Sequence, residues 1–378
     1  MTMILPGSTI GILGGGQLAR MMILEARRMG YRTVTLDPDP DAAGAQIADE
    51  RVVGGLSDCE KILAVARMSD VVTLDSEHIP AAALRVAESQ RLLRPHAGVL
   101  ECIQDRLSQR LFLEALTLPQ AKFISIDSDG ALTSAVKRAK FPAVLKTRRS
   151  GYDGKGQRLI AAAHNLADAW ESLGRVACIL EEFVTFEREV SVVMARSVNG
   201  EVMFYPPAEN THRKHVLHIS RMPASLGKNA DWVAKAKAIS EKIATSLSYI
   251  GVLTVEFFLK DDGHLLINEI APRTHNSGHA TFGACLTSQF EQHVRAVCGL
   301  KLGPSSMLAC GAIINLLGEF WLQSGGPPWS EIFQIPEVTC HIYGKKEARL
   351  GRKMGHILVT AQSEGEVDNI LGRLSKFV

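Results

Sequence analysis

Residues 255–269 read Val-Glu-Phe-Phe-Leu-Lys-Asp-Asp-Gly-His-Leu-Leu-Ile-Asn-Glu, which is the pattern of a β-hairpin with an acidic residue near each end. Asp262-Gly263 is a strong signal for a two-residue turn, and a turn centred there places Glu256 opposite Glu269 on one face of a sheet. Directly opposed residues have Cβ atoms about 5 Å apart. Two carboxylates at that distance repel by roughly 3 kcal/mol at an effective dielectric constant near 20.

The residues beside these two carboxylates are apolar, among them Val255, Phe257 and Ile267, so we expect the hairpin in the core. A divalent cation removes the repulsion, and carboxylate ligation shared with phosphate oxygens is typical of Mg²⁺. We therefore interpret Glu256 and Glu269 as metal ligands. Three other arrangements stay open: one carboxyl group with a raised pKa, a basic side chain between the two, or a pairing shifted by one residue.

A glycine-rich segment upstream of the hairpin, Ser-Gly-Tyr-Asp-Gly-Lys-Gly-Gln at 150–157, lies between an expected strand that ends in Lys146 and another that starts at Arg158. Because no helix follows, this is not a Walker loop. A loop of this kind between antiparallel strands is expected to be a flap whose backbone N–H groups fold over a triphosphate, with Lys146 meeting its charge. The alternative is a solvated hairpin tip.

A second glycine cluster, Gly14-Gly15-Gly16-Gln17-Leu18-Ala19, follows an expected strand and opens an expected helix, and Asp37 ends the next strand. This is the dinucleotide-binding fingerprint in its usual context. The same turn can bind any phosphate, because a helix N-terminus offers free N–H groups to every anion. Dinucleotide binding, another phosphate ligand and a purely structural turn all stay open on these residues alone.

The wider pattern predicts an α/β and α+β multidomain chain, because 378 residues exceed what one core usually supports. Residues 1–100 alternate short β-branched runs with helical patterns, which predicts a parallel sheet. Residues 101–298 contain longer strands joined by hairpins, which is typical of an antiparallel α+β domain. Residues 299–378 form a third, β-rich segment that closes with a helix near 364–374.

Composition excludes several classes of function. A net charge of +2 without long basic runs disfavours nucleic acid as a partner. Seven scattered cysteines without a C-x-x-C pair suggest neither a disulfide framework nor a zinc knuckle, and they favour a cytoplasmic location. No run of 18 apolar residues is present, so we expect no membrane span.

Lys146, the 150–157 loop, Glu-Glu-Phe-Val at 181–184, Glu256 and the string INEIAPRTHNSGH at 267–279 together resemble the ATP-grasp superfamily. From end to end the chain is most similar to the N5-carboxyaminoimidazole ribonucleotide synthetase family of purine synthesis. The resemblance implies a preATP-grasp domain, an ATP-grasp domain with a lid and a small C-terminal domain. It also implies ATP and Mg²⁺, the substrates bicarbonate and aminoimidazole ribonucleotide, a homodimer, and a possible hand-off of product to a mutase.

The family's functional residues carry over onto matching positions of this chain. ATP is then expected at Arg106, Lys146, Gly151, Tyr152, Asp153, Gly154, Lys155, Gly156, Gln157, Glu181, Glu182, Phe183, Val184, Glu189, His212, Asn268 and Glu269. Bicarbonate and the ribonucleotide are expected at Gly16, Gln17, Leu18, Glu77, Tyr152, Asp153, Arg273, His275, Asn276, Ser277, Lys345 and Arg352. Arg273, Lys146 and Asp153 are the expected catalytic residues.

The chain departs from the family pattern in two places. Residues 73–79 read Thr-Leu-Asp-Ser-Glu-His-Ile where Thr-Tyr-Glu-Phe-Glu-Asn-Val is common, and Ser150 replaces the usual first glycine of its loop. Three rival functions stay open, and the departure at 73–79 bears on the last of them. They are another ATP-grasp ligase or carboxylase of purine or biotin-dependent metabolism, an NAD-dependent dehydrogenase, and a nucleotide-binding regulatory protein without turnover.

Overall fold

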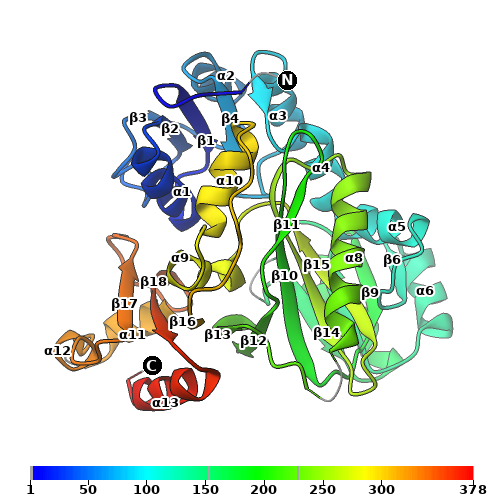
Figure 1. The fold of residues 1–378 in the computed structure, drawn as a ribbon. Helices are drawn as coiled ribbons and strands as arrows, with labels where there is room; N and C mark the ends of the chain where they lie inside the picture. The colour runs from blue at the N-terminus through cyan, green and yellow to red at the C-terminus, as the bar shows by residue number, and fades with distance from the viewer. Residues whose placement is uncertain (1–2, 152–153, 228–229, 325, 378) are drawn as a thin grey trace.

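The computed structural model describes residues 3–151, 154–227, 230–324 and 326–377, which fold into three β-sheets flanked by helices (Figure 1). The five-stranded sheet near the N-terminus has the order β3-β2-β1-β4-β5, and every pair in it is parallel. This confirms the parallel sheet expected from the alternating strand and helix patterns. Its strands are β1 (Thr9–Leu13), β2 (Arg32–Asp37), β3 (Glu50–Val53), β4 (Val71–Leu74) and β5 (Leu92–Leu93).

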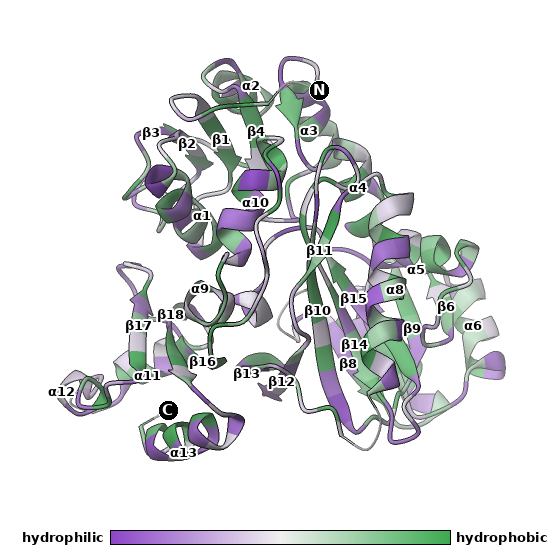
Figure 2. Ribbon diagram, in the orientation of Figure 1, coloured by the Kyte–Doolittle hydropathy of each residue, from purple (hydrophilic) through white to green (hydrophobic). Residues whose placement is uncertain are grey.

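Alternate side chains of β1 point to opposite faces of this sheet and bury different helices. Ile10 and Ile12 pack with α1 (Gln17–Arg28) and α10 (Gln289–Val297), whereas Leu13 packs on the side of α2 (Cys59–Arg67) and α3 (Ala81–Glu88). Figure 1 shows α10 beside α1 although the two helices are far apart in the sequence. The central strands β1 and β4 are drawn largely in the green of hydrophobic residues, as expected for buried strands that are covered on both faces (Figure 2).

The four-stranded sheet carries the glycine-rich loop. Its order is β6-β9-β7-β8 and all its pairs are antiparallel. Because β7 pairs directly with β8, the loop at 150–157 connects two neighbouring antiparallel strands, as predicted. The elements around it are α4 (Ala97–Ile103), α5 (Arg106–Ala115), β6 (Phe123–Ile126), α6 (Asp129–Arg138), β7 (Ala143–Thr147), β8 (Gln157–Ile160), η1 (Ala163–Asn165), α7 (Leu166–Ser172) and β9 (Cys178–Glu182).

The nine-stranded antiparallel sheet runs in the order β15-β14-β10-β12-β13-β16-β18-β17, with β11 added beside β10. It continues from the middle of the chain into the C-terminal segment, because β13 pairs with β16. Its strands are β10 (Arg188–Arg196), β11 (Val202–Phe204), β12 (Ala208–Arg213), β13 (Val216–Met222), β14 (Gly251–Leu259), β15 (Leu265–Ala271), β16 (Cys310–Leu317), β17 (Val338–Ile342) and β18 (Lys353–Ala361). Helices α8 (Asp231–Ser246), α9 (Thr281–Ala284), α11 (Gly318–Leu322), α12 (Trp329–Ile332) and α13 (Glu364–Leu374) accompany it, with the short turn η2 (Asn276–Gly278).

The hairpin of β14 and β15 pairs Glu256 with Glu269, as predicted, but its turn differs from the prediction. Leu259 pairs with Leu265, and the N–H of Gly263 donates to the carbonyl of Lys260. The two-residue turn centred on 262–263 is therefore wrong, because the register near the turn is shifted by one. A bulge at position 268 adds one residue to β15, and this restores the opposition of the two glutamates.

Hydrophobic clusters extend across the boundaries of the three predicted segments, 1–100, 101–298 and 299–378. One continuous cluster joins α2, α3 and the parallel sheet to α8, β10, β14 and β15. Another packs α13 against β16 and β18. The division at those boundaries stays a prediction. No helix in the described part of the chain is long and apolar enough to cross a bilayer.

Candidate active site

The two opposed glutamates lie among buried neighbours. Val255 and Phe257 are buried beside Glu256, whose own pKa is raised to about 7 by burial and by the charge of Glu269. Basic groups also approach the pair, which was one of the alternatives left open by the sequence. His275 Nε2 lies 3.5 Å from Glu256 Oε1, and Arg106 Nη1 lies 3.7 Å from Glu269 Oε2. The raised pKa of Glu256 shows that the charge of Glu269 disfavours its ionisation, and the two basic side chains offset part of this effect.

The chemistry of this donor set fits Mg²⁺. Both donors are carboxylate oxygens, which are the ligands that Mg²⁺ prefers, and Mg²⁺ is commonly held by one or two carboxylates together with substrate phosphates. Among the described residues, no group of three or more His, Cys, Asp or Glu side chains is arranged to hold a metal ion on its own. Glu256 and Glu269 would therefore hold the ion jointly with a bound nucleotide.

A buried ion-pair triad lies at the base of the glycine-rich loop. Lys146 Nζ on β7 is 2.6 Å from Glu181 Oε2 on β9, and Arg110 Nε on α5 is 2.6 Å from Glu181 Oε1. Burial acts to raise the pKa of Glu181, but the two cations lower it to about 2. Burial lowers the pKa of Lys146. The sequence analysis did not single out Arg110, although it lies one helical turn after Arg106.

Arg110 also connects the triad to the metal hairpin. Its Nη1 and Nη2 donate to the carbonyls of Ile267 and Asn268, at 3.1 and 2.9 Å. The expected ATP residue Asn268 is therefore the bulged residue of β15, held by a buried guanidinium. Arg110 thus fixes the position of Lys146 and of the strand that carries Glu269 at the same time.

The glycine-rich loop is described except for Tyr152 and Asp153, two expected site residues that lie outside the described residues. Gly154 and Gly156 have φ angles of +77° and +74°, where a side chain would be strained. Ser150 also has a positive φ, +62°. The family's glycine at that position is therefore replaced here by a residue that adopts the left-handed region at a cost.

Arg273 lies opposite Glu77, which comes from the N-terminal sheet region. Arg273 Nη2 donates to Glu77 Oε1 at 2.8 Å, and its Nε donates to Oε2. Burial opposes ionisation of Glu77, yet Arg273 lowers the pKa of that carboxyl to about 2. This bidentate pair places the expected catalytic arginine at the junction of the parallel and the nine-stranded sheets. The structure thereby brings together two residues that are 196 positions apart.

The η2 turn after β15 carries three expected substrate residues. Burial and the charge of Arg273 lower the pKa of His275. The oxygen and the nitrogen of the Asn276 amide are both buried, and neither has a hydrogen-bond partner among the described residues. A buried amide without a partner is costly, so Asn276 fits a residue that bonds to a ligand. Ser277 is fully buried and contacts His275.

The N-terminal glycine turn already holds two carboxylates. The N–H of Gly15 donates to Asp37 Oδ2 at 2.8 Å, and the N–H of Gly16 donates to Asp75 Oδ2 at 2.7 Å. Burial raises the pKa of Asp75 to about 6. In the dinucleotide interpretation Asp37 would bind a ribose; here it bonds to the turn itself. Asp75 is a departure from the family motif, and its bond to Gly16 could not be predicted from the sequence.

The C-terminal segment adds positive charge beside this turn. Lys345 Nζ donates to Gln17 Oε1 at 2.9 Å. Burial and the nearby cations Arg352 and Lys353 lower the pKa of Lys345 to about 8. The charge of Lys353 also acts to lower the pKa of Glu256, against the larger effects of burial and Glu269. The only signal for Lys353 in the sequence is its place in a basic stretch.

Of the other expected ATP residues, Glu182 lies on β9, Glu189 on β10 and His212 on β12, and Phe183 and Val184 directly follow β9. His212 Nδ1 is 2.6 Å from Glu189 Oε2, and this partner raises the pKa of His212 against the effect of burial. The N–H groups of Glu182 and Phe183 already donate to the carbonyls of Lys122 and Pro142. A nucleotide base bound at 181–184 would therefore have to accept hydrogen bonds from other donor groups of this segment.

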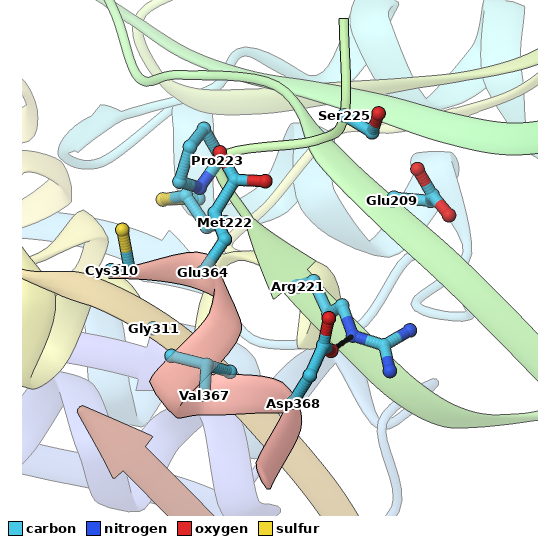
Figure 3. Close-up of a pocket in the computed structure, with 10 residues that line it drawn as sticks. All are labelled: Glu209, Arg221, Met222, Pro223, Ser225, Cys310, Gly311, Glu364, Val367 and Asp368. Atoms are coloured by element: carbon cyan, nitrogen blue, oxygen red, sulfur yellow. Dashed lines mark ion pairs between the residues drawn. The ribbon is translucent and has the colours of Figure 1, made fainter. Parts of the chain in front are cut away.

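A cavity of about 260 Å³ lies elsewhere, between the end of β13 and the start of α13 (Figure 3). The ion pair of Arg221 Nε with Asp368 Oδ1, 3.0 Å apart, lies in its wall. Neither Lys146 nor Arg273 lines it, and neither do the two opposed glutamates. We therefore assign the candidate site to the region around β14, β15 and η2.

Comparison with known proteins identifies the family of the chain. The chain matches the ribonucleotide synthetase preATP-grasp domain over residues 7–104, the ATP-grasp domain over 111–290 and the phosphoribosylaminoimidazole carboxylase C-terminal domain over 311–370.

Relatives match over almost the whole chain. It is 42% identical to the N5-carboxyaminoimidazole ribonucleotide synthase of Bacillus subtilis, over 96% of this chain and 94% of that protein. The synthetase structure from Thermus thermophilus has a TM-score of 0.90 at 40% identity, with 98% of each chain covered. The synthase of Aspergillus clavatus in complex with ADP and 5-aminoimidazole ribonucleotide has a TM-score of 0.87 at 27% identity, again with 98% of each chain covered. The chain therefore belongs to the N5-carboxyaminoimidazole ribonucleotide synthase family of ATP-grasp enzymes.

Proposed function

We propose that this chain catalyses the ATP-dependent carboxylation of 5-aminoimidazole ribonucleotide by bicarbonate. The products are N5-carboxyaminoimidazole ribonucleotide, ADP and phosphate. The observation that carries the proposal is the opposition of Glu256 and Glu269 beside Arg273 and the buried η2 turn. The Aspergillus clavatus relative, which binds ADP and the same ribonucleotide, supports the choice of substrate.

Bicarbonate is a poor electrophile and must be activated first. In the proposed sequence a bicarbonate oxygen attacks the γ-phosphorus of ATP, the bond to the β-phosphate oxygen breaks, and carboxyphosphate and ADP form. Bound Mg²⁺ supplies charge neutralisation on the phosphoryl oxygens. Lys146 contributes a further positive charge, held in place by Glu181, and Arg273 holds the bicarbonate-derived anion.

In the second step the exocyclic amine of the ribonucleotide attacks the carbonyl carbon of carboxyphosphate. Phosphate leaves with the electron pair of the C–O bond, and the new carbamate nitrogen loses a proton. Because water would destroy carboxyphosphate, the glycine-rich loop is assigned the role of a closing flap. Lys345 and Arg352 are assigned to the ribonucleotide phosphate, since the N–H groups of the glycine turn already bond to Asp37 and Asp75.

The test is phosphate release with ATP, Mg²⁺ and bicarbonate, with and without aminoimidazole ribonucleotide. We expect strong stimulation by that ribonucleotide and incorporation of ¹³C from labelled bicarbonate into the product. Stimulation by a different purine intermediate or by a biotin carrier, without a response to aminoimidazole ribonucleotide, would transfer the assignment to another ATP-grasp ligase. The homodimer and the hand-off to a mutase remain predictions from the resemblance, and the cytoplasmic location remains a prediction from the cysteine pattern.

A further inference from the structure

A chain of buried hydrogen bonds crosses three strands of the nine-stranded sheet and ends at the η2 turn. Ser220 Oγ on β13 donates to Asn210 Oδ1 on β12 at 2.7 Å, and Asn210 Nδ2 donates to Ser191 Oγ on β10 at 3.1 Å. Ser191 Oγ then donates to Ser277 Oγ at 2.7 Å. All four side chains are buried. Apolar residues of similar size could fill this space, so packing alone does not require the chain.

The chain ends on one nitrogen of His275. Ser277 Oγ lies 2.9 Å from His275 Nδ1, and the backbone N–H of Ser277 donates to the same nitrogen at 3.3 Å. A ring nitrogen that accepts a hydrogen bond carries no proton, so the neutral ring carries its proton on Nε2. That nitrogen faces Glu256 Oε1 at 3.5 Å.

Asn210 sets the direction of the whole chain. Each serine hydroxyl has one proton to donate, so the direction of one bond fixes the direction of the next. Because the amide nitrogen of Asn210 donates to Ser191, the Ser191 proton is directed to Ser277 and the Ser277 proton to His275. An acceptor in place of that nitrogen would reverse the bonds from Ser191 to His275 and favour a proton on Nδ1, against the 3.3 Å bond from the backbone N–H of Ser277.

We propose that Ser191 and Asn210 are positioning residues for the carboxylation, which act through Ser277 to hold His275 as the Nε2–H tautomer. In this form the ring presents a hydrogen-bond donor to the bicarbonate-derived anion. The opposite tautomer would present a lone pair to an anion and to Glu256. The catalytic part of this inference rests on the proposed function, whereas the tautomer does not.

The discriminating variant is Asn210→Asp, which keeps the shape of the side chain and removes its donors. Ser191 must then donate to the carboxylate, whereas Ser220 can donate to it or to the carbonyl of Ser277 at 3.3 Å. The Ser277 proton therefore turns toward Ser191. We expect the His275 proton to move from Nε2 to Nδ1. The readout is ¹⁵N NMR of histidine-labelled protein without ligands, with the His275 signals identified by their loss in His275→Gln.

Two further variants keep the test independent of folding problems. Ser191→Ala breaks the chain without adding charge, and we expect it to leave a mixture of tautomers, with Ser191→Thr restoring the Nε2–H form. Asn315→Asp is the matched control, because Asn315 is a buried asparagine on β16 whose Nδ2 donates to the Leu217 carbonyl at 2.8 Å. This control places a carboxylate in the same sheet, outside the chain, and the His275 tautomer should not change.

Kinetics test the catalytic part. In Asn210→Asp we expect kcat/KM for bicarbonate to fall by about 100-fold, as on loss of one donor to a developing anion, with KM for ATP unchanged. An unaltered tautomer in both Asn210→Asp and Ser191→Ala would overturn the proposal. A reversed tautomer with normal bicarbonate kinetics would overturn the catalytic role. Wild-type protein without ribonucleotide-dependent turnover would instead remove the proposed function, and the tautomer measurement would still stand.

Discussion

Replacing Glu181 by glutamine removes the one anion that lies between Lys146 and Arg110. The Glu181 side chain is only 4% exposed, and its partners lower its pKa from the ordinary value of 4.5 to about 2. That difference corresponds to about 3 kcal/mol of folding free energy. Breaking a buried ion pair by removing one partner typically costs about 3–5 kcal/mol, so both routes give the same magnitude.

The pH dependence has a definite sign. Because folding lowers this pKa, the contribution is fully present above pH 4.5 and is lost as the pH falls toward 2. The stability difference between the wild-type protein and Glu181→Gln should therefore be about 1 kcal/mol smaller at pH 4 than at pH 7.

The assay is hydrogen–deuterium exchange of the backbone amides in β7 and β9, which reports local opening and does not require two-state unfolding of a multidomain chain. Glu182→Gln, the next residue on β9, is the matched control and should stay within about 0.5 kcal/mol of wild type. A loss of local stability below about 1 kcal/mol in Glu181→Gln at pH 7 would refute the reasoning. A loss of stability that does not change with pH would refute it as well.

Three other outcomes follow from the site. Glu269→Gln should abolish ADP formation while circular dichroism shows an intact fold, and near-normal turnover would argue against metal ligation. The KM for the ribonucleotide should rise above pH 8, where Lys345 loses its charge, and Lys345→Met should show a high KM without this dependence. A flat wild-type profile would contradict that role. Ser150→Gly should raise the thermal midpoint, because glycine adopts the left-handed backbone at φ +62° without strain. The expected gain in the free energy of unfolding is up to about 1 kcal/mol. A lowered midpoint would exclude strain at this position.

The sequence predicted the parallel sheet, the hairpins and the opposed glutamates because these depend on local patterns. The glutamate pair was correct although the turn was wrong, since the bulge at Asn268 compensates for the longer turn. No sequence pattern indicates the bulge or the longer turn strongly enough to outweigh the two-residue turn signal of Asp262-Gly263.

Residues whose roles depend on distant partners could not be predicted. Arg110 meets Glu181 across 71 positions and Asp75 meets Gly16 across 59. Ser191 and Asn210 look like ordinary strand residues until the sheet places them beside Ser277. Helix α10 covers the N-terminal sheet, and nothing in its sequence pattern showed this.

The pairing of β13 with β16 has a practical consequence for dissecting this protein. A fragment that stops before residue 310 would expose the whole edge of β13, with its ladder of unpaired N–H and C=O groups, to other molecules. Bare edges of this kind recruit strands from neighbouring chains, so such a fragment should self-associate at concentrations where the intact chain does not. Fusion proteins and circular permutants should therefore be designed with β13 and β16 in one polypeptide. Their new chain ends should lie in exposed turns.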